Sequence, residues 1–148
     1  MKQTPSFRPI WKVAIASVVV PGLHVVTVPV VYVMLSLLFM EHDRNGAGFE
    51  PRWVGQLAIY GDAVVVSAIA GSILGNSKGM QASHGLAAGI SSGLIRAGIH
   101  YGTEALRGYP PDDLSDFLLG VGLCSLAFAP VTFFFCARAA RKRDLYLC

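Results

Sequence analysis

The chain has 148 residues, of which 53% are hydrophobic and 14% are charged, with a mean hydropathy of +0.54. A water-soluble domain of this composition would expose large apolar patches, so the composition predicts that lipid is the main solvent. The formal net charge is only +3, and the basic residues gather at the chain ends without interleaved aromatics, which argues against nucleic-acid binding. Three scattered cysteines are too few for a disulfide framework.

Four apolar runs predict an all-α, polytopic membrane protein whose single domain is a four-transmembrane-helix bundle. The runs cover residues 13–40, 53–75, 84–102 and 114–137. Each is near or above the roughly 20 residues that cross a hydrocarbon core. The first run is longer than needed and contains Pro21 and Pro29, so it tilts, kinks, or begins as an interfacial segment that spans only from about Leu23. The sequence leaves these three alternatives open.

Basic residues flanking the runs predict that both chain ends face the cytoplasm. They are Lys2, Arg8 and Lys12 before the first run, and Arg138, Arg141, Lys142 and Arg143 at the end of the last. Positive residues in short flanking segments stay on the cytoplasmic side of the membrane. The middle connector contributes Lys78 alone and would not decide the orientation by itself. We expect a location in the cytoplasmic (inner) membrane of a bacterium, with the lipid bilayer as the first partner.

Small residues recur at four-residue spacing in the second and third runs. They are Ala63, Ser67, Gly71 and Gly75 in the second run, and Gly85, Gly89 and Gly93 in the third. Such stripes let two helix backbones approach closely in lipid. The preferred interpretation is a tight hairpin between these two spans, and the alternative is an interface between copies. Gly98 and Gly102 form a second small pair on another face of the third run, which leaves room for both.

Ionisable residues inside the same two runs are the candidate functional residues. Asp62 lies about 13 Å from Trp53 along a helix, close to mid-membrane, and Arg96 reaches a similar depth on the antiparallel run. The two are natural partners, and His100 and Glu104 follow Arg96 at helical spacing. Asp62 points about 100° away from its own small-residue stripe, however. An equally consistent arrangement turns it toward the first or fourth run, where His24, Thr27, Ser36, Ser125 or Thr132 are possible partners.

Two roles for Asp62, Arg96 and His100 remain equally supported: an ion or proton pathway, and a charge pair that locks the hairpin. We interpret His24 as a hydrogen-bonded bundle residue. Haem held by two histidines is disfavoured, because His24 and His100 lie in opposite halves of the membrane. The adjacent residues Glu41, His42 and Asp43 are expected to be solvated and not to bind a metal. We expect no cofactor and identify no catalytic residue.

Two functions follow from these observations. The preferred one is an accessory or structural subunit that packs its helices against a second copy or a larger membrane complex, because short connectors leave little soluble surface for catalysis. The alternative is a small ion- or proton-coupled transporter, which at four helices needs to dimerise to enclose a pathway. A membrane enzyme ranks third, since Asp62 and His100 alone do not define a reaction.

Overall fold

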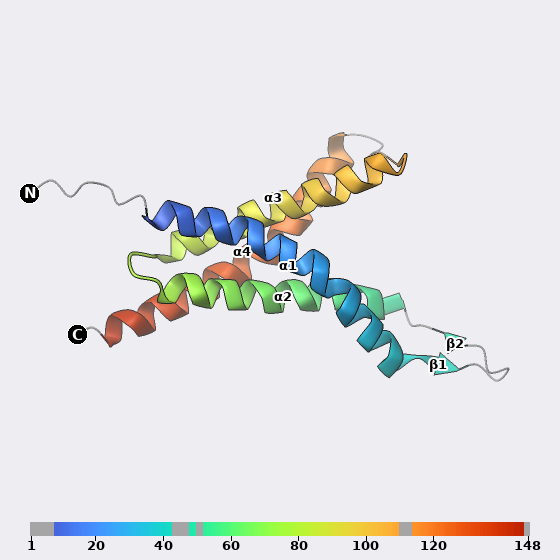
Figure 1. The fold of residues 1–148 in the computed structure, drawn as a ribbon, viewed down its shortest axis with the longest axis horizontal. Coiled ribbons are helices and arrows are strands. Elements are labelled where there is room, and N and C mark those ends of the chain that lie inside the picture. The colour runs from blue at the N-terminus through green and yellow to red at the C-terminus, as the bar shows by residue number, and fades with distance from the viewer. Residues whose placement is uncertain (1–7, 43–47, 50–51, 110–113, 147–148) are drawn as a thin grey trace, which may run out of the picture.

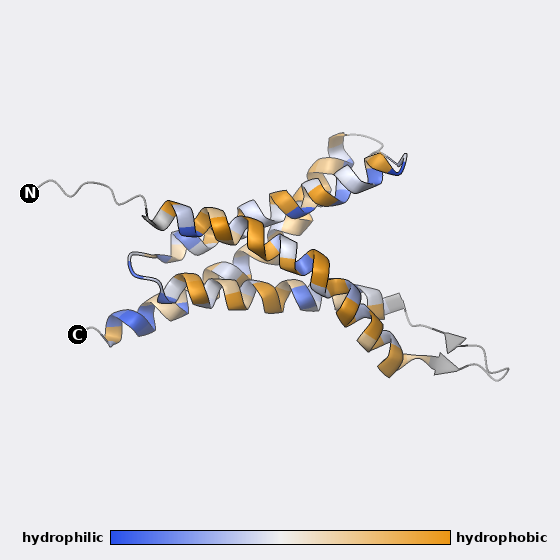
Figure 2. Cartoon of the chain, in the orientation of Figure 1, coloured by the Kyte–Doolittle hydropathy of each residue, from blue (hydrophilic) through white to orange (hydrophobic). Residues whose placement is uncertain are grey.

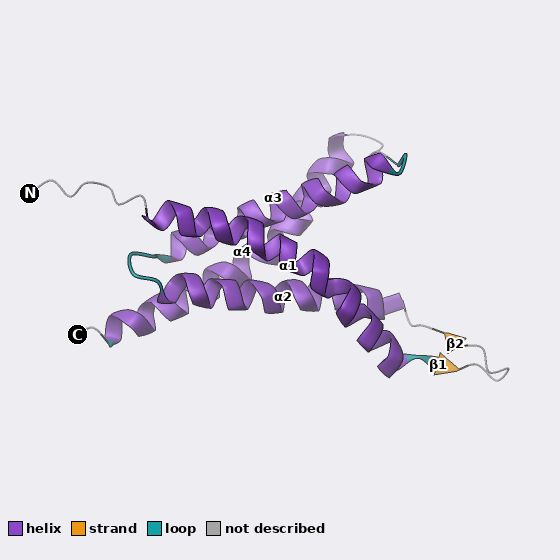
Figure 3. Cartoon of the chain, in the orientation of Figure 1, coloured by secondary structure: helices purple, strands orange, loops and turns teal. Residues whose placement is uncertain are grey.

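Four long helices make up nearly all of the structure. The computed structural model of the chain describes residues 8–42, 48–49, 52–109 and 114–146. The helices are α1 (Arg8–Phe39), α2 (Arg52–Asn76), α3 (Ala82–Leu106) and α4 (Leu114–Leu145). A short antiparallel pair, β1 (Glu41–His42) and β2 (Gly48–Phe49), joins α1 to α2, with Glu41 opposite Phe49 (Figure 3). The predicted all-α fold with four helices is confirmed.

The helices run up and down between two ends of the molecule. The first described turn of α1, the α2–α3 turn and the C-terminal end of α4 lie at one end, which we call the terminal end (Figure 1). The β1–β2 pair, the C-terminal end of α3 and the N-terminal end of α4 lie at the other, which we call the far end. Toward the far end the molecule separates into two arms, α1 with α2 and α3 with α4.

Three helices are long and apolar enough to cross a membrane. These stretches are Ile10–Phe39, Trp53–Asn76 and Leu114–Leu145. Hydrophobic residues follow them along most of their length, and hydrophilic residues gather at the C-terminal end of α4 (Figure 2). Helix α3 is not in this group, because its many glycines and serines, together with His84 and Arg96, lower the mean hydropathy of its sequence. Three of the four predicted runs therefore form helices with the length and composition of membrane spans.

Both prolines of the first run lie inside one continuous helix. Pro21 and Pro29 fall within α1, which changes direction past its midpoint (Figure 1). Proline removes a backbone hydrogen-bond donor and its ring clashes with the preceding turn, which is the usual cause of such bends. The structure thus shows the kink that was one of the three alternatives for this run.

The glycines of α2 and α3 pack against α4, although their spacing predicts that α2 and α3 contact each other directly. A Cβ atom placed on Gly71 of α2 would lie 2.5 Å from the backbone oxygen of Thr132, and one on Gly89 of α3 would lie 2.5 Å from the Cα of Ala129. Gly75 and Gly85 both face Cys136, and Gly93 faces Ser125. The small-residue stripes are therefore sites of close packing, but each packs on α4. The expected α2–α3 hairpin interface is wrong.

The reason is a third stripe of small side chains on α4 itself. Its members are Ser125, Ala129, Thr132, Cys136 and Ala139, spaced three or four residues apart. They contain no glycine, so the stripe does not stand out in the sequence, yet its spacing places all five on one face of a helix. One helix with a small face can meet two glycine stripes at once. Close backbone packing then supplies association energy that lipid does not.

Side chains from distant segments hold each end of the molecule together. At the terminal end, the Arg143 guanidinium donates to the backbone oxygens of Gly75, Ser77 and Met80 at 3.1, 2.5 and 3.3 Å. These bonds satisfy one carbonyl in the last turn of α2 and two in the connection to α3. At the far end, the Phe39 and Trp53 rings meet edge to face with centroids 5.0 Å apart. This contact joins α1 to α2 at the far end.

Candidate functional site

A polar cluster joins α1 to α2 inside the membrane-spanning region. The Nδ1 atom of His24 lies 2.8 Å from Oδ2 of Asp62, and the Thr27 hydroxyl lies 2.7 Å from the same oxygen. His24 and Thr27 come from adjacent turns of α1, so both reach one carboxylate on α2. This selects the alternative in which Asp62 turns toward the first run, and it confirms that His24 is a hydrogen-bonded residue of the bundle.

Two of the three side chains in the cluster, His24 and Asp62, are buried, and Thr27 is partly buried. His24 is 2% exposed and Asp62 is 7% exposed. The Phe128 ring of α4 meets the imidazole edge to face at 5.3 Å and covers its remaining side. The Thr27 hydroxyl also lies 2.8 Å from the Leu23 carbonyl, and its single hydrogen can donate fully to only one of the two acceptors. The buried imidazole and the buried carboxylate thus satisfy each other across α1 and α2.

Arg96, the predicted partner of Asp62, does not bond to it among the described residues. Its guanidinium is near enough to His24 of α1 and Cys124 of α4 to act on both electrostatically. Its Nε atom is buried and has no hydrogen-bond partner within the described part of the chain. The arginine therefore reaches the same interior region as Asp62 and contributes positive charge there, without forming the predicted ion pair.

The other two residues of the predicted polar stripe lie apart from this cluster. His100 is exposed, and its ring packs against the neighbouring Tyr101 at 5.2 Å. Glu104 pairs with Arg107 at 3.4 Å near the end of α3. Tyr101 in turn donates to the Asp116 carbonyl at 2.8 Å and ties α3 to α4. The structure therefore does not join His100 or Glu104 to Asp62.

Helix lengths explain why His24, and not His100, lies beside Asp62. Counted from the terminal end, Asp62 is about 21 Å from Asn76, Arg96 is about 21 Å from Ala82, and His24 is about 24 Å from Arg8, at about 1.5 Å per residue. All three thus lie at one level. The depth of Asp62 measured from Trp53 does not reveal that it matches the depth of His24, because α1 is longer than α2 and continues into β1. The depth measured from the terminal end is the sequence signal that identifies His24.

Metal coordination finds no support among the described side chains, where no three His, Cys, Asp or Glu residues gather closely enough to hold an ion. Asp43, one member of the Glu41, His42 and Asp43 group, lies outside the described residues, and the side chains of the other two are not described. The available chemistry is therefore that of the cluster: a carboxylate, an imidazole and a hydroxyl that exchange hydrogen bonds in a mostly buried site.

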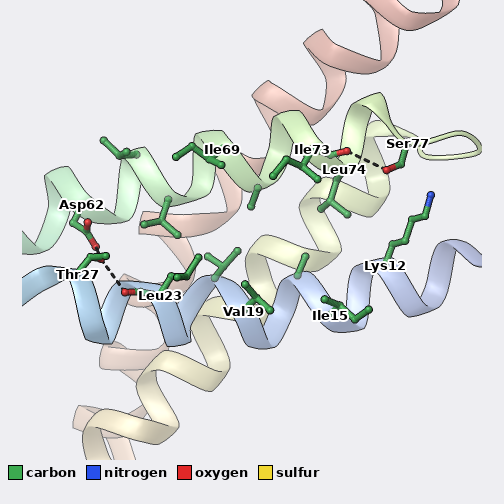
Figure 4. A pocket seen from close by; sticks show the side chains of 15 residues that line it. Lys12, Ile15, Val19, Leu23, Thr27, Asp62, Ile69, Ile73, Leu74 and Ser77 are labelled. Carbon is green, nitrogen blue, oxygen red and sulfur yellow. Dashed lines mark hydrogen bonds between the residues drawn. The ribbon is translucent and has the colours of Figure 1, made fainter.

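A groove of about 470 Å³ runs beside this cluster between α1 and α2. Thr27 and Asp62 stand across from each other at one end, and Lys12 and Ser77 stand at the other (Figure 4). Its walls between these ends are apolar, with Ile15 and Val19 on α1 and Ile69 and Ile73 on α2. The groove therefore has one charged end and one hydrogen-bonded end.

The fold and the site define a class of protein. Three helices that can cross a membrane, a largely apolar outer surface and a mostly buried polar cluster are the features of a helical, multi-pass integral membrane protein. Comparison with protein-family models, with curated proteins and with solved structures finds no match.

Proposed function

We propose that the chain is a four-span membrane protein with both ends in the cytoplasm, acting as an accessory or structural subunit through close helix packing. Helix α3 serves as the fourth span. Its 25 residues cover about 37 Å, more than the roughly 30 Å of a hydrocarbon core. Its Arg96 is partly buried, and α4 covers its glycine stripe, so the less apolar sequence is partly shielded from lipid.

The position of the termini supports the topology. The N-terminal turn of α1 and the C-terminal end of α4 lie at the same end of the molecule, as an even number of crossings requires (Figure 1). The basic residues Arg138, Arg141 and Lys142 lie on the last turns of α4 at that end. Positive charge near the ends of spans favours the cytoplasmic side.

Reporter fusions test this topology. Fusions after Cys148 and within residues 1–9 are expected to be cytoplasmic, whereas fusions near Gly46 and Arg107 are expected to be external. Alkaline phosphatase and green fluorescent protein fusions give opposite activities on the two sides and serve as mutual controls. An external C-terminus would show that α3 does not cross the membrane.

One uncovered face of α3 supports the proposal that the chain is a subunit that packs against other helices. A Cβ atom on Gly98 or Gly102 would have nothing within 4 Å, so this small pair is open along one side of the helix. The two glycines are four residues apart and so lie on one side of the helix. A face of small residues suits another helix, because the two backbones can approach closely there. The other glycine stripes are already covered by α4.

Leucine substitutions on the open face test the assembly role. Gly98→Leu and Gly102→Leu are expected to abolish self-association or co-purification of a partner, because the new side chains hold the neighbouring helix away. The fold is expected to be retained, since both positions are open. Gly122→Leu, at an equally open position on α4, is the matched control. Size-exclusion chromatography with light scattering gives the oligomeric state. Wild-type protein that is monomeric and purifies alone would contradict the proposal.

A small ion- or proton-coupled transporter is the second candidate. The observation in its favour is the enclosed His24–Asp62 pair at the level of Arg96, since ionisable residues inside a membrane commonly mark ion pathways. The sequence predicts an ion or proton pathway through Asp62, Arg96 and His100, whereas the pathway proposed here consists of His24, Asp62 and Arg96. His100 lies outside the cluster and has no part in this form of the proposal.

A further inference from the structure

The groove between α1 and α2 has the length of one bilayer leaflet. Its α1 wall runs from Lys12 to Thr27 and its α2 wall from Ser77 to Asp62, each about 22 Å at about 1.5 Å per residue. Half of a bilayer, including its headgroup region, is about 20–22 Å thick. The groove therefore extends from the headgroup level at the terminal end to the middle of the membrane.

Side-chain size creates the groove and leaves it open along one side. Ala16 and Ala70 are too small to fill the space between the helices, and Val20 and Val66 are buried at its floor. Ile69 and Ile73 stand along the rim and are 57% and 64% exposed. The walls offer almost no polar atoms between the two ends. An occupant must therefore be a flexible hydrocarbon chain that can enter sideways from the surrounding lipid.

The two ends differ in charge, which gives the occupant a direction. At the headgroup level, Lys12 has no carboxylate partner among the described residues, and a long lysine side chain can extend its ammonium along an apolar surface to the interface. At mid-membrane, Asp62 and Thr27 are bonded to each other and to their neighbours. An anionic headgroup thus fits the Lys12 end, and a hydrocarbon terminus fits the Thr27 end.

We propose that this groove is a binding site for one acyl chain of an anionic phospholipid, whose phosphate pairs with Lys12. The volume of about 470 Å³ falls in the range of roughly 300–1,000 Å³ that is usual for small-ligand sites. The site depends on charge at one end and on apolar surface along its length. It therefore distinguishes lipids by headgroup as well as by chain.

Native mass spectrometry of the full chain tests the headgroup preference. Phosphatidylglycerol is expected to remain bound to at least five-fold more protein than phosphatidylcholine with the same acyl chains, at equal lipid concentration. Lys12→Glu is expected to abolish this preference. Arg141→Glu makes the same charge change at the same end of the molecule, outside the groove, and is expected to retain it. Equal losses in the two variants would mean general surface attraction only and would overturn the proposal.

Photo-crosslinking of the wild-type protein tests the location without any substitution. Phosphatidylglycerol carrying a diazirine in its acyl chain is expected to label the groove walls between Lys12 and Thr27 and between Asp62 and Ser77. The exposed residues Leu119 and Leu126 of α4 are expected to be labelled several-fold less. Even labelling of both surfaces would identify ordinary bulk lipid. A bifunctional crosslink joining two copies through Ile69 would assign the groove to a second chain. Either result excludes the proposed site.

Discussion

Replacing His24 by Leu is expected to lower the free energy of unfolding by about 3–5 kcal/mol, because it leaves a buried carboxylate with only the Thr27 hydroxyl. Asp62→Leu is expected to be destabilising as well, since the imidazole then has no acceptor under the Phe128 ring. The double variant is expected to recover much of the loss because neither polar group remains stranded. Unfolding in detergent by a chemical denaturant measures all four proteins.

A second cycle that pairs Asp62→Leu with Arg96→Gln is the control for this result. Arg96 acts on the cluster electrostatically but does not bond to Asp62 among the described residues, so its coupling energy with Asp62 is expected to be smaller than that of His24. Additive losses in the His24–Asp62 cycle, or stronger coupling to Arg96, would show that the hydrogen-bonded pair has been assigned to the wrong residues.

The same proteins separate the two proposed functions. In liposomes with imposed proton and cation gradients, an accessory subunit gives no flux, and its folded His24–Asp62 double variant still assembles normally. A transporter gives flux in the wild type and none in the folded double variant, because leucine cannot bind and release a proton. Flux in the wild-type protein would therefore favour the second candidate over the first.

The second large effect is that the same change, glycine to alanine, is expected to lower the stability of the protein at one position of α3 and not at another. Gly89→Ala is expected to destabilise the protein by about 1–3 kcal/mol, because the added Cβ lies 2.5 Å from the Cα of Ala129 and α3 and α4 must separate. Gly98→Ala is expected to be neutral or to stabilise by up to about 1 kcal/mol, since the position is open and alanine favours a helix. Thermal unfolding in one detergent compares the two.

Gly71→Ala extends this comparison to the other side of α4. Its Cβ would lie 2.5 Å from the Thr132 backbone oxygen, so a loss similar to that of Gly89→Ala is expected. If Gly89→Ala and Gly98→Ala had the same effect, α4 would not lie against the α3 glycine stripe. A loss at Gly89 but none at Gly71 would place α4 against α3 alone.

Much of the architecture follows from the sequence because the membrane constrains it strongly. Apolar runs of sufficient length predict helices, since backbone polar groups in lipid must be satisfied within the segment. All four observed helices contain or closely match the predicted runs, and three have the composition of spans. The depth of Asp62 and Arg96 also follows from counting residues, because a helix advances by a constant rise.

The partners of these elements depend on the tertiary structure. Glycine stripes on α2 and α3 indicate close packing, but Ser125, Ala129 and Thr132 form an equally suitable face on α4, and only the three-dimensional arrangement selects it. Asp62 likewise had several partners within reach. The packing of α1 against α2 brings His24 and Thr27 to its carboxylate, and Arg96 does not bond to it among the described residues. Residue spacing determines which face of a helix a side chain occupies, whereas helix rotation and crossing determine what that face meets.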